Sequence, residues 1–162
     1  MPHIREEAAT FASDGRAILL DCFYGNGSRQ LPAVIALHGS GGGHRYASEP
    51  ARLLTAQGYA VYVLHYFDRT GTVWADKESI RRHFVAWMGT VRDAISYVSQ
   101  RPEVDVERIG LLGFSLGAYR ALSVAAPTNP IRSRPASTKA KTNRNSSACS
   151  SCKLAPAYIS MM

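Results

Sequence analysis

The stretch that decides the fold is Arg108-Ile109-Gly110-Leu111-Leu112-Gly113-Phe114-Ser115-Leu116-Gly117-Ala118. Its short apolar run, residues 109–112, predicts a buried strand, and residues 118–126 favour a helix. The turn between them has the pattern G-x-S-x-G, centred on Ser115. A serine on a tight strand-to-helix turn is typical of a catalytic nucleophile, so we predict that role for Ser115.

The neighbours of Ser115 support this prediction. Gly113 and Gly117 lack a Cβ atom, which lets a strand and a helix approach each other closely. The start of the helix presents free N–H groups to developing negative charge, and we expect the Leu116 N–H to be one oxyanion donor. The alternative is a plain glycine-rich turn, which the flanking strand and helix make the weaker interpretation.

The chain before this stretch alternates between strand and helix patterns. Apolar and β-branched runs predict strands at Ala8–Ala12, Ala17–Tyr24, Leu31–Leu37 and Tyr59–Leu64, the first two joined as a hairpin. Helices are predicted from an N-cap at Ser48 to Gly58, with Leu53 and Leu54 facing the sheet, and from Asp76 to Val98. This alternation predicts an α/β fold with a parallel sheet and helices on both faces.

Polar residues follow three of these strands. His38, His65 and Ser115 each stand just beyond a strand, so we expect them at the carboxyl edge of the sheet, where open α/β folds place their sites. Glycines after His38 let the backbone turn its N–H groups toward the serine. We expect the second oxyanion donor to be the Ser40 N–H, with Gly41 as the next candidate.

Several motifs occur in order and resemble a known family. The matching segments are Pro32–Gly42, Gly58–Val61, His65–Thr72 and Asp105–Tyr119. Together they resemble the α/β-hydrolase superfamily, and more narrowly the dienelactone hydrolase family. This resemblance implies a partial α/β-hydrolase fold, small-molecule carboxylic esters or lactones as substrates, and no cofactor. The dienelactone hydrolases proper carry cysteine at the nucleophile position, where this chain has Ser115, so simple esters fit better than enol-lactones.

One part of the family's machinery has no counterpart in this sequence. In this fold the triad acid and histidine both follow the nucleophile, yet residues 116–162 contain no Asp, Glu or His. His38 and His65 lie near the predicted site, but strand-end hydrogen bonds are the favoured interpretation of both. We therefore predict an impaired serine hydrolase that lacks the later strands of the fold. The alternative is a catalytically inactive truncated fragment, or a binding module of the same descent.

The composition changes after residue 126. Residues 1–126 contain 13 basic and 12 acidic residues, whereas residues 127–162 contain six basic residues and no acidic one. The second segment is of low complexity and has too few apolar residues to form a core. We predict an N-terminal part of a hydrolase domain at 1–126 and a disordered basic tail at 127–162, read out of frame.

Other functions are disfavoured by the sequence. The first residues have no signal-peptide core, no apolar run is long enough to span a bilayer, and three cysteines are too few for a disulfide framework, so we expect a cytoplasmic protein. Cys149 and Cys152 have only Cys22 to complete a zinc site, so no metal is expected. Tyr158 is the one aromatic residue of the tail, which argues against a nucleic-acid partner. We do expect self-association through the exposed strand 109–112.

Overall fold

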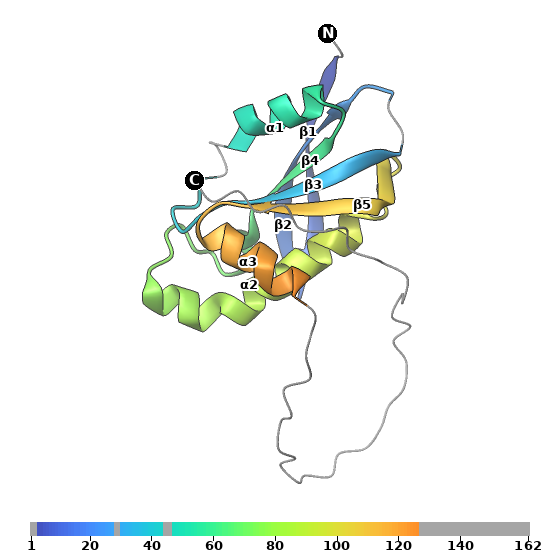
Figure 1. Ribbon diagram of the computed structural model, residues 1–162. Coiled ribbons are helices and arrows are strands. Elements are labelled where there is room, and N and C mark those ends of the chain that lie inside the picture. Colours follow the sequence, from blue (N-terminus) through green and yellow to red (C-terminus); the bar gives the residue numbers. More distant parts are fainter. Residues whose placement is uncertain (1–2, 28–29, 44–46, 127–162) are drawn as a thin grey trace, which may run out of the picture.

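The computed structural model describes residues 3–27, 30–43 and 47–126. The tail for which we predicted disorder, residues 127–162, lies outside the described residues. The elements are β1 (Ile4–Ser13), β2 (Arg16–Gly25), β3 (Leu31–Leu37), α1 (Ser48–Ala56), β4 (Ala60–Leu64), η2 (Tyr66–Arg69), α2 (Lys77–Val98), β5 (Val104–Gly113) and α3 (Leu116–Ala125) (Figure 1). This order of strands and helices confirms the predicted α/β class.

The described strands form one sheet in the order β1-β2-β4-β3-β5. Strand β3 pairs in parallel with both β4 and β5, while β2 pairs antiparallel with β1 and β4. The parallel centre follows from the helical crossovers, since a parallel pair cannot be joined by a tight hairpin. Strand β5, which leads to Ser115, is the last strand on its side of the described sheet.

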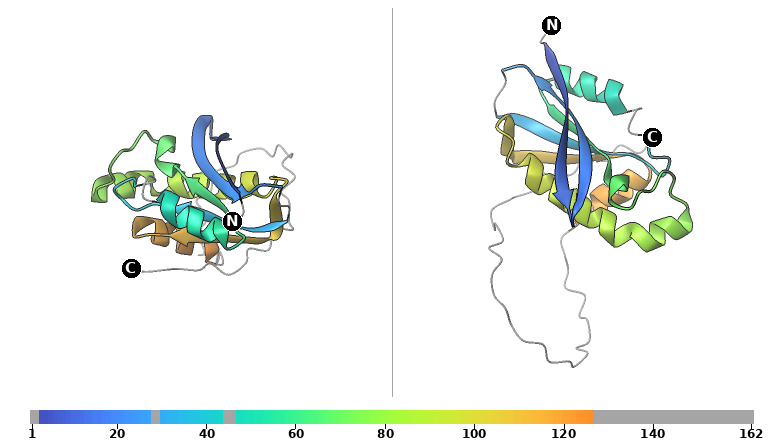
Figure 2. Two further views of the ribbon diagram at one scale, coloured as in Figure 1. Left: turned by 90° about the horizontal axis from the view of Figure 1, so that it is seen from above. Right: turned by 180° about the vertical axis from the view of Figure 1, so that it is seen from behind.

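Helices cover both faces of the sheet, as predicted. Helices α2 and α3 lie together on one face, and α1 lies on the other (Figures 1 and 2). The larger core is on the α2–α3 side and includes Trp87, Val91 and Leu116. The smaller core on the α1 side joins Ala51 to Phe23, Val61 and Val63.

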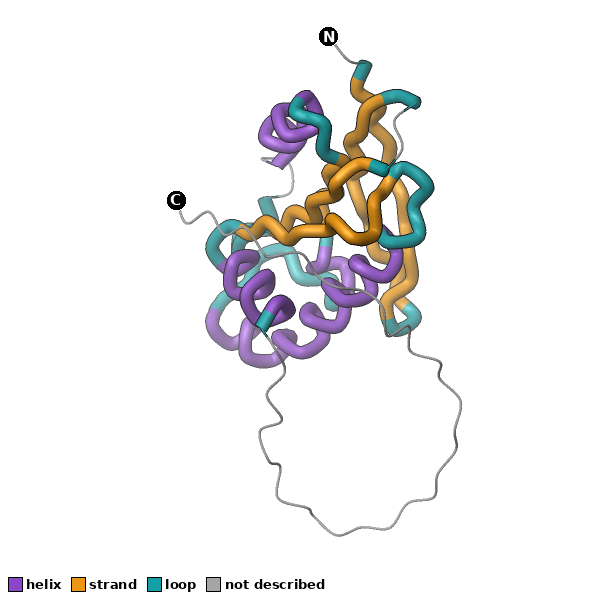
Figure 3. The backbone as a smooth tube through the Cα atoms, turned by 45° about the vertical axis from the view of Figure 1, so that its right-hand side comes forward, coloured by secondary structure: helices purple, strands orange, loops and turns teal. Residues whose placement is uncertain are grey.

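Helix α2 forms where its apolar residues recur at helical spacing. Trp87, Val91 and Val98 are fully buried, while Asp76 caps the N-terminus by accepting a hydrogen bond from the Ser79 N–H at 2.8 Å. The tip of the β1–β2 hairpin packs against this helix (Figure 3). The predicted helix start at Asp76 is thus confirmed.

Two details of the prediction are wrong. The N-cap of α1 is Ala47 rather than Ser48, and no side chain of the described residues caps its N-terminus. Leu53 does not face the sheet but is 70% exposed, because the helix turns Ala51 and Thr55 inward instead. Thr55 is held there by donating a hydrogen bond to the Phe23 carbonyl, at 3.3 Å.

Strand β5 is longer than the predicted run 109–112. It begins at Val104, because a register shift opposite Leu31 and Ala33 lets β3 pair with both halves of β5. The irregularity interrupts the regular pairing. The first residues of β5 therefore show no regular alternation of apolar residues from which a strand could be predicted.

Candidate active site

The register of the parallel strands brings three strand ends into line. Leu37 of β3 is paired with Leu64 of β4 on one side and with Gly113 of β5 on the other. His38, His65 and Ser115 therefore leave the sheet at the same carboxyl edge, as the sequence predicts.

Ser115 occupies an unusual backbone conformation at the start of α3. Its φ is 52° and its ψ is −115°, in the region that favours glycine. Residues held in such conformations cost about 1–3 kcal/mol and persist where the surrounding structure enforces them. The side chain is exposed at the turn between β5 and α3.

Two glycines make this turn sterically possible. A Cβ atom on Gly113 would lie 2.3 Å from the carbonyl group of Gly117, and one on Gly117 would lie 2.1 Å from the carbonyl oxygen of Leu37. Any larger residue at either position would collide with backbone. The two glycines of the G-x-S-x-G pattern are thus needed because β5, β3 and α3 approach one another closely at this turn.

The loop after β3 lies directly against the serine. A Cβ atom on Gly39 would stand 3.3 Å from the Ser115 Cβ. Two hydrogen bonds from later in the chain hold the loop: the Tyr66 hydroxyl donates to the His38 carbonyl at 2.7 Å, and the Ala75 N–H donates to the Ser40 carbonyl at 2.9 Å. The loop is therefore fixed beside Ser115 by the segment that follows β4.

Backbone donors gather at this place. Within residues 3–27, 30–43 and 47–126, the N–H groups of Leu116, Ser40 and Gly41 have no hydrogen-bond acceptor. The neighbouring N–H groups are engaged, since Gly117 donates to the Phe114 carbonyl at 2.9 Å. Unpaired N–H groups at a helix start are the usual binding partners of an anionic oxygen.

His38 is part of an aromatic cluster below the loop. Its ring is 7% exposed and stacks on Tyr66 with the ring centroids 4.2 Å apart, and Phe67 meets it edge-on. Its Nδ1 lies 2.9 Å from the Gly39 carbonyl oxygen. These contacts have the form of the strand-end hydrogen bond that we favoured for His38.

His65 is paired with an acid on a different strand. Its Nε2 lies 2.8 Å from Oδ2 of Asp21, on β2. Strand β3 separates β4 from β5, so His65 and Ser115 leave strands that are two spacings, roughly 10 Å, apart. Ser115 lies next to Gly39, whereas the hydrogen-bond partner of His65 is on β2.

Sequence reasoning missed a buried cation beneath the site. Arg120 of α3 is fully buried, and its guanidinium lies 4.0 Å from the ring centroid of Phe84 and 4.9 Å from that of Trp87. Nη1 donates to the Phe84 carbonyl at 2.9 Å, whereas Nε and Nη2 have no hydrogen-bond partner among the described residues. Burial lowers the pKa of Arg120 to about 10. The one feature of the sequence that could have indicated its burial is its position one helical turn after Leu116, on the same face of the helix.

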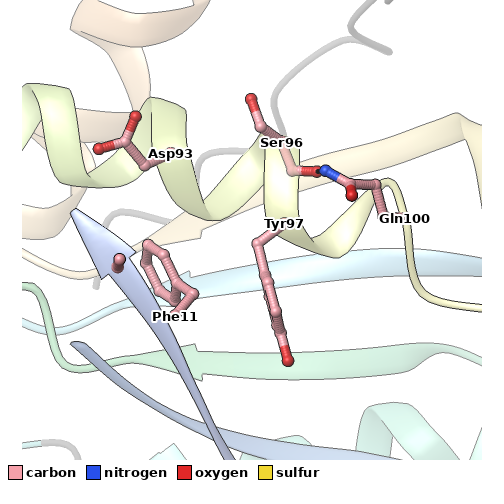
Figure 4. A pocket seen from close by; sticks show the side chains of 6 residues that line it. Phe11, Asp93, Ser96, Tyr97 and Gln100 are labelled. Carbon is pink, nitrogen blue, oxygen red and sulfur yellow. Dashed lines mark hydrogen bonds between the residues drawn. The ribbon is translucent and has the colours of Figure 1, made fainter. Parts of the chain in front are cut away.

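Other features of the described residues offer no competing site. Among them, no group of three or more His, Cys, Asp or Glu side chains could hold a metal ion, and no helix is long and apolar enough to cross a membrane. Burial raises the pKa of the Cys22 thiol to about 12, which makes it unreactive. A hollow between β1 and α2 is lined by Phe11 and Tyr97 (Figure 4), and none of His38, His65 and Ser115 lines it.

The comparison with known families agrees with this geometry. Residues 21–138 match the sequence profile of the dienelactone hydrolase family, which is more than half of the chain. The chain belongs to the dienelactone hydrolase family. Membership confirms the resemblance on which the fold was predicted.

Individual relatives are more distant. The mouse protein acyl-coenzyme A thioesterase 6 is 33% identical over 100 residues, which cover 62% of this chain and 22% of that protein. A dienelactone hydrolase-like promiscuous phosphotriesterase from metagenomic libraries has a similar fold, with a TM-score of 0.64, 21% identity, and coverage of 75% of this chain and 54% of that one. An esterase from Pyrobaculum calidifontis gives a TM-score of 0.61 and 23% identity over 75% of this chain and 39% of that one.

The coverages also show how much of each relative is matched. The chain spans about a fifth of the curated relative and roughly half of the phosphotriesterase. The similar structures share the fold of the described residues, in which β5 and α3 are the last elements.

Proposed function

We propose that this chain carries the nucleophile and the oxyanion hole of an ester or thioester hydrolase, with Ser115 as the nucleophile. The observation that carries the proposal is the backbone of Ser115, whose positive φ is enforced by the contacts of Gly113 and Gly117. Strain of this kind is found where a side chain must be held in place for chemistry. Family membership and the thioesterase relative supply the reaction class.

The proposed chemistry is acyl transfer. The Ser115 Oγ attacks the carbonyl carbon, its proton passes to a base, and the carbonyl electrons move to the oxygen. The N–H groups of Leu116 and Ser40, with Gly41 as the alternative, would stabilise that oxyanion. The alcohol or thiol then leaves with a proton, and water releases the acid from the acyl-serine.

The proposal assigns no residue of this chain as the general base. No Asp, Glu or His follows Ser115 in the sequence, and we propose structural roles for His38 and His65. Removing the whole triad of subtilisin lowers kcat by about 10⁶, so we expect the 162-residue chain to turn over p-nitrophenyl butyrate very slowly. Ser115-dependent turnover at the rate of full-length relatives would refute this expectation and would indicate a base upstream.

A covalent probe tests the nucleophile without requiring turnover. A p-nitrophenyl alkylphosphonate is incubated with the chain, with imidazole added as an external base, and the adduct is mapped by mass spectrometry. We expect a phosphonyl group on Ser115, none in Ser115→Ala, and an undiminished adduct in the control Ser123→Ala on the same helix. Labelling that is absent, or that is equal in Ser115→Ala, would contradict the nucleophile assignment and favour the inactive or binding-module alternative.

A further inference from the structure

Two exposed aromatic side chains lie against the loop after β3, Phe114 at Gly39 and Trp74 at Gly41. Phe114 is 59% exposed and Trp74 is 68% exposed, whereas the aromatic residues beneath them, Tyr66 and Trp87, are fully buried. Large aromatic side chains left in water represent unused binding surface. Their position relative to the loop after β3 shows what they could contact.

Trp74 is fixed against the oxyanion loop rather than free on the surface. Its ring carbon Cζ3 lies 3.3 Å from the place where a Cβ on Gly41 would stand, and the neighbouring Val73 carbonyl lies 3.0 Å from the corresponding place on Gly42. The Ala75 N–H donates to the Ser40 carbonyl at 2.9 Å. The residues on both sides of Trp74 are thus tied to this loop, and its indole covers one end of it.

Phe114 covers the other end of the same loop. Its Cδ1 lies 3.4 Å from the place of a Cβ on Gly39, and Ser115 lies 3.3 Å from that same place. The Phe114 N–H donates to the Leu37 carbonyl at 3.1 Å, which fixes the backbone that carries the ring. Phe114 therefore lies at Gly39 and Trp74 at Gly41, on either side of the proposed oxyanion donor Ser40.

The segments that carry this surface contain no charged residue, although Arg69, Asp76 and Arg120 adjoin them in the sequence. Residues 37–43, 70–75 and 113–119, which carry the loop, the indole and the serine, contain no Lys, Arg, Asp or Glu. A site for a carboxylate-bearing substrate needs a cationic partner, and these segments offer none. They suit an uncharged apolar group.

We propose that Trp74 and Phe114 form the subsite for the apolar acyl chain of a neutral ester or thioester. This assignment rests on the function proposed above. With the carbonyl oxygen at the N–H groups of Ser40 and Leu116, the chain of the substrate lies across the indole and the phenyl ring. The preferred substrate class is then esters or thioesters with an uncharged apolar acyl chain rather than lactones that bear a carboxylate.

The test measures binding in the Ser115→Ala chain, so that it does not depend on catalysis. The probe is octan-2-one, which has an ester-like carbonyl and an acyl chain but cannot be hydrolysed. We expect saturable binding by ligand-observed NMR, with a blue shift of the Trp74 emission and protection of this tryptophan from acrylamide. Octanoate, of the same length but charged, should bind more weakly.

The variants separate this subsite from general hydrophobic binding. Trp74→Ala should raise the Kd of octan-2-one about tenfold, corresponding to roughly 1.4 kcal/mol of lost apolar contact, and Phe114→Ala should raise it too. Trp74→Phe should bind nearly as well as the parent. Leu53→Ala removes a side chain of similar exposure on α1 and should have no effect.

Three outcomes would overturn the proposal: binding that is unchanged in Trp74→Ala, binding that is weakened equally by Leu53→Ala, or tighter binding of octanoate than of octan-2-one. Near-ultraviolet circular dichroism confirms that each variant is folded. Failure here with phosphonate labelling of Ser115 intact would refute the subsite alone. Loss of labelling with binding intact would refute the nucleophile alone.

Discussion

At the scale of single residues, Arg120 is the side chain whose environment conflicts most with its chemistry. Its charge is fully buried, and within the part of the chain that the structure describes two of its nitrogen atoms lack a hydrogen-bond acceptor. There, the Phe84 carbonyl and two aromatic rings are what offsets the loss of water. Because burial makes its pKa lower in the folded chain than in the unfolded chain, the charge opposes folding at neutral pH. This opposition is fully present below pH 10 and fades as the pH rises above it.

We therefore predict that Arg120→Met stabilises the chain. Replacing a buried charge by an apolar side chain of similar length is often neutral or stabilising by about 1–4 kcal/mol, and we expect a gain of roughly 1–2 kcal/mol with a higher Tm. Thermal unfolding followed by circular dichroism at pH 7 measures this. The control is Arg92→Met on the exposed side of α2, which should change little. A clear loss of stability specific to Arg120→Met would show that its aromatic and carbonyl contacts outweigh its desolvation.

At the scale of elements, a partly buried ionic network around the buried Glu103 fastens the β1–β2 hairpin to the parallel strands. Arg101, just after α2, reaches Glu7 of β1 at 2.5 Å and Glu103 at 2.8 Å. Glu103 is 5% exposed and also accepts a hydrogen bond from the Tyr62 hydroxyl at 2.6 Å. The network spans β1, β4 and the start of β5, so it fixes where the hairpin crosses the sheet.

Arg101→Ala should destabilise the chain by about 3–5 kcal/mol, because it leaves Glu103 buried without its cation. The control is Arg82→Ala, whose ion pair with Glu78, at 3.4 Å, is exposed on both sides. Exposed pairs contribute about 0–1 kcal/mol, so the control should lose little. Urea unfolding of both variants gives the comparison. Equal losses would mean that the network contributes no more than a surface pair.

The elements differ in how far the sequence could predict them. Strand β3 and the turn at Ser115 were predictable, because an apolar run and a G-x-S-x-G pattern each leave few alternatives. The orientation of α1 was not, since Leu53 and Ala51 both fit an apolar face and tertiary packing on Phe23 chose the latter. The places of Arg101 and Arg120 were harder to predict, because a charged residue predicts exposure, and for Arg120 the one signal was its helical spacing from Leu116.

The candidate site shows the same division. Its backbone parts follow from local pattern, whereas Trp74 owes its place to contacts with Gly41 that are more than 30 residues away in the sequence. Nothing in the segment Thr72–Ala75 indicates by itself that it lies on the loop after β3. Such long-range contacts are fixed by the order of strands in the sheet, which no local period encodes.

At the scale of the whole molecule, strand β5 has a consequence for assembly. Within the described residues, β5 pairs with β3 on one side and with no strand on the other. Its segment Ile109–Leu112 carries no charge and no proline, the two features that usually prevent strand edges from pairing with other chains. We expect copies of the 162-residue chain to associate through this edge.

Size-exclusion chromatography with light scattering tests this expectation, and a designed variant locates the contact. Leu112→Lys places a charge on the edge strand, at a partly exposed position, and should shift the chain toward the monomer because a buried lysine at a strand pair is unfavourable. Leu53→Lys adds the same charge on α1, away from the edge, and should leave the assembly unchanged. A monodisperse parent monomer with a cooperative thermal transition would contradict the prediction. So would an equal response to both lysines, because a contact made by β5 must be more sensitive to a charge on that strand than to one on α1.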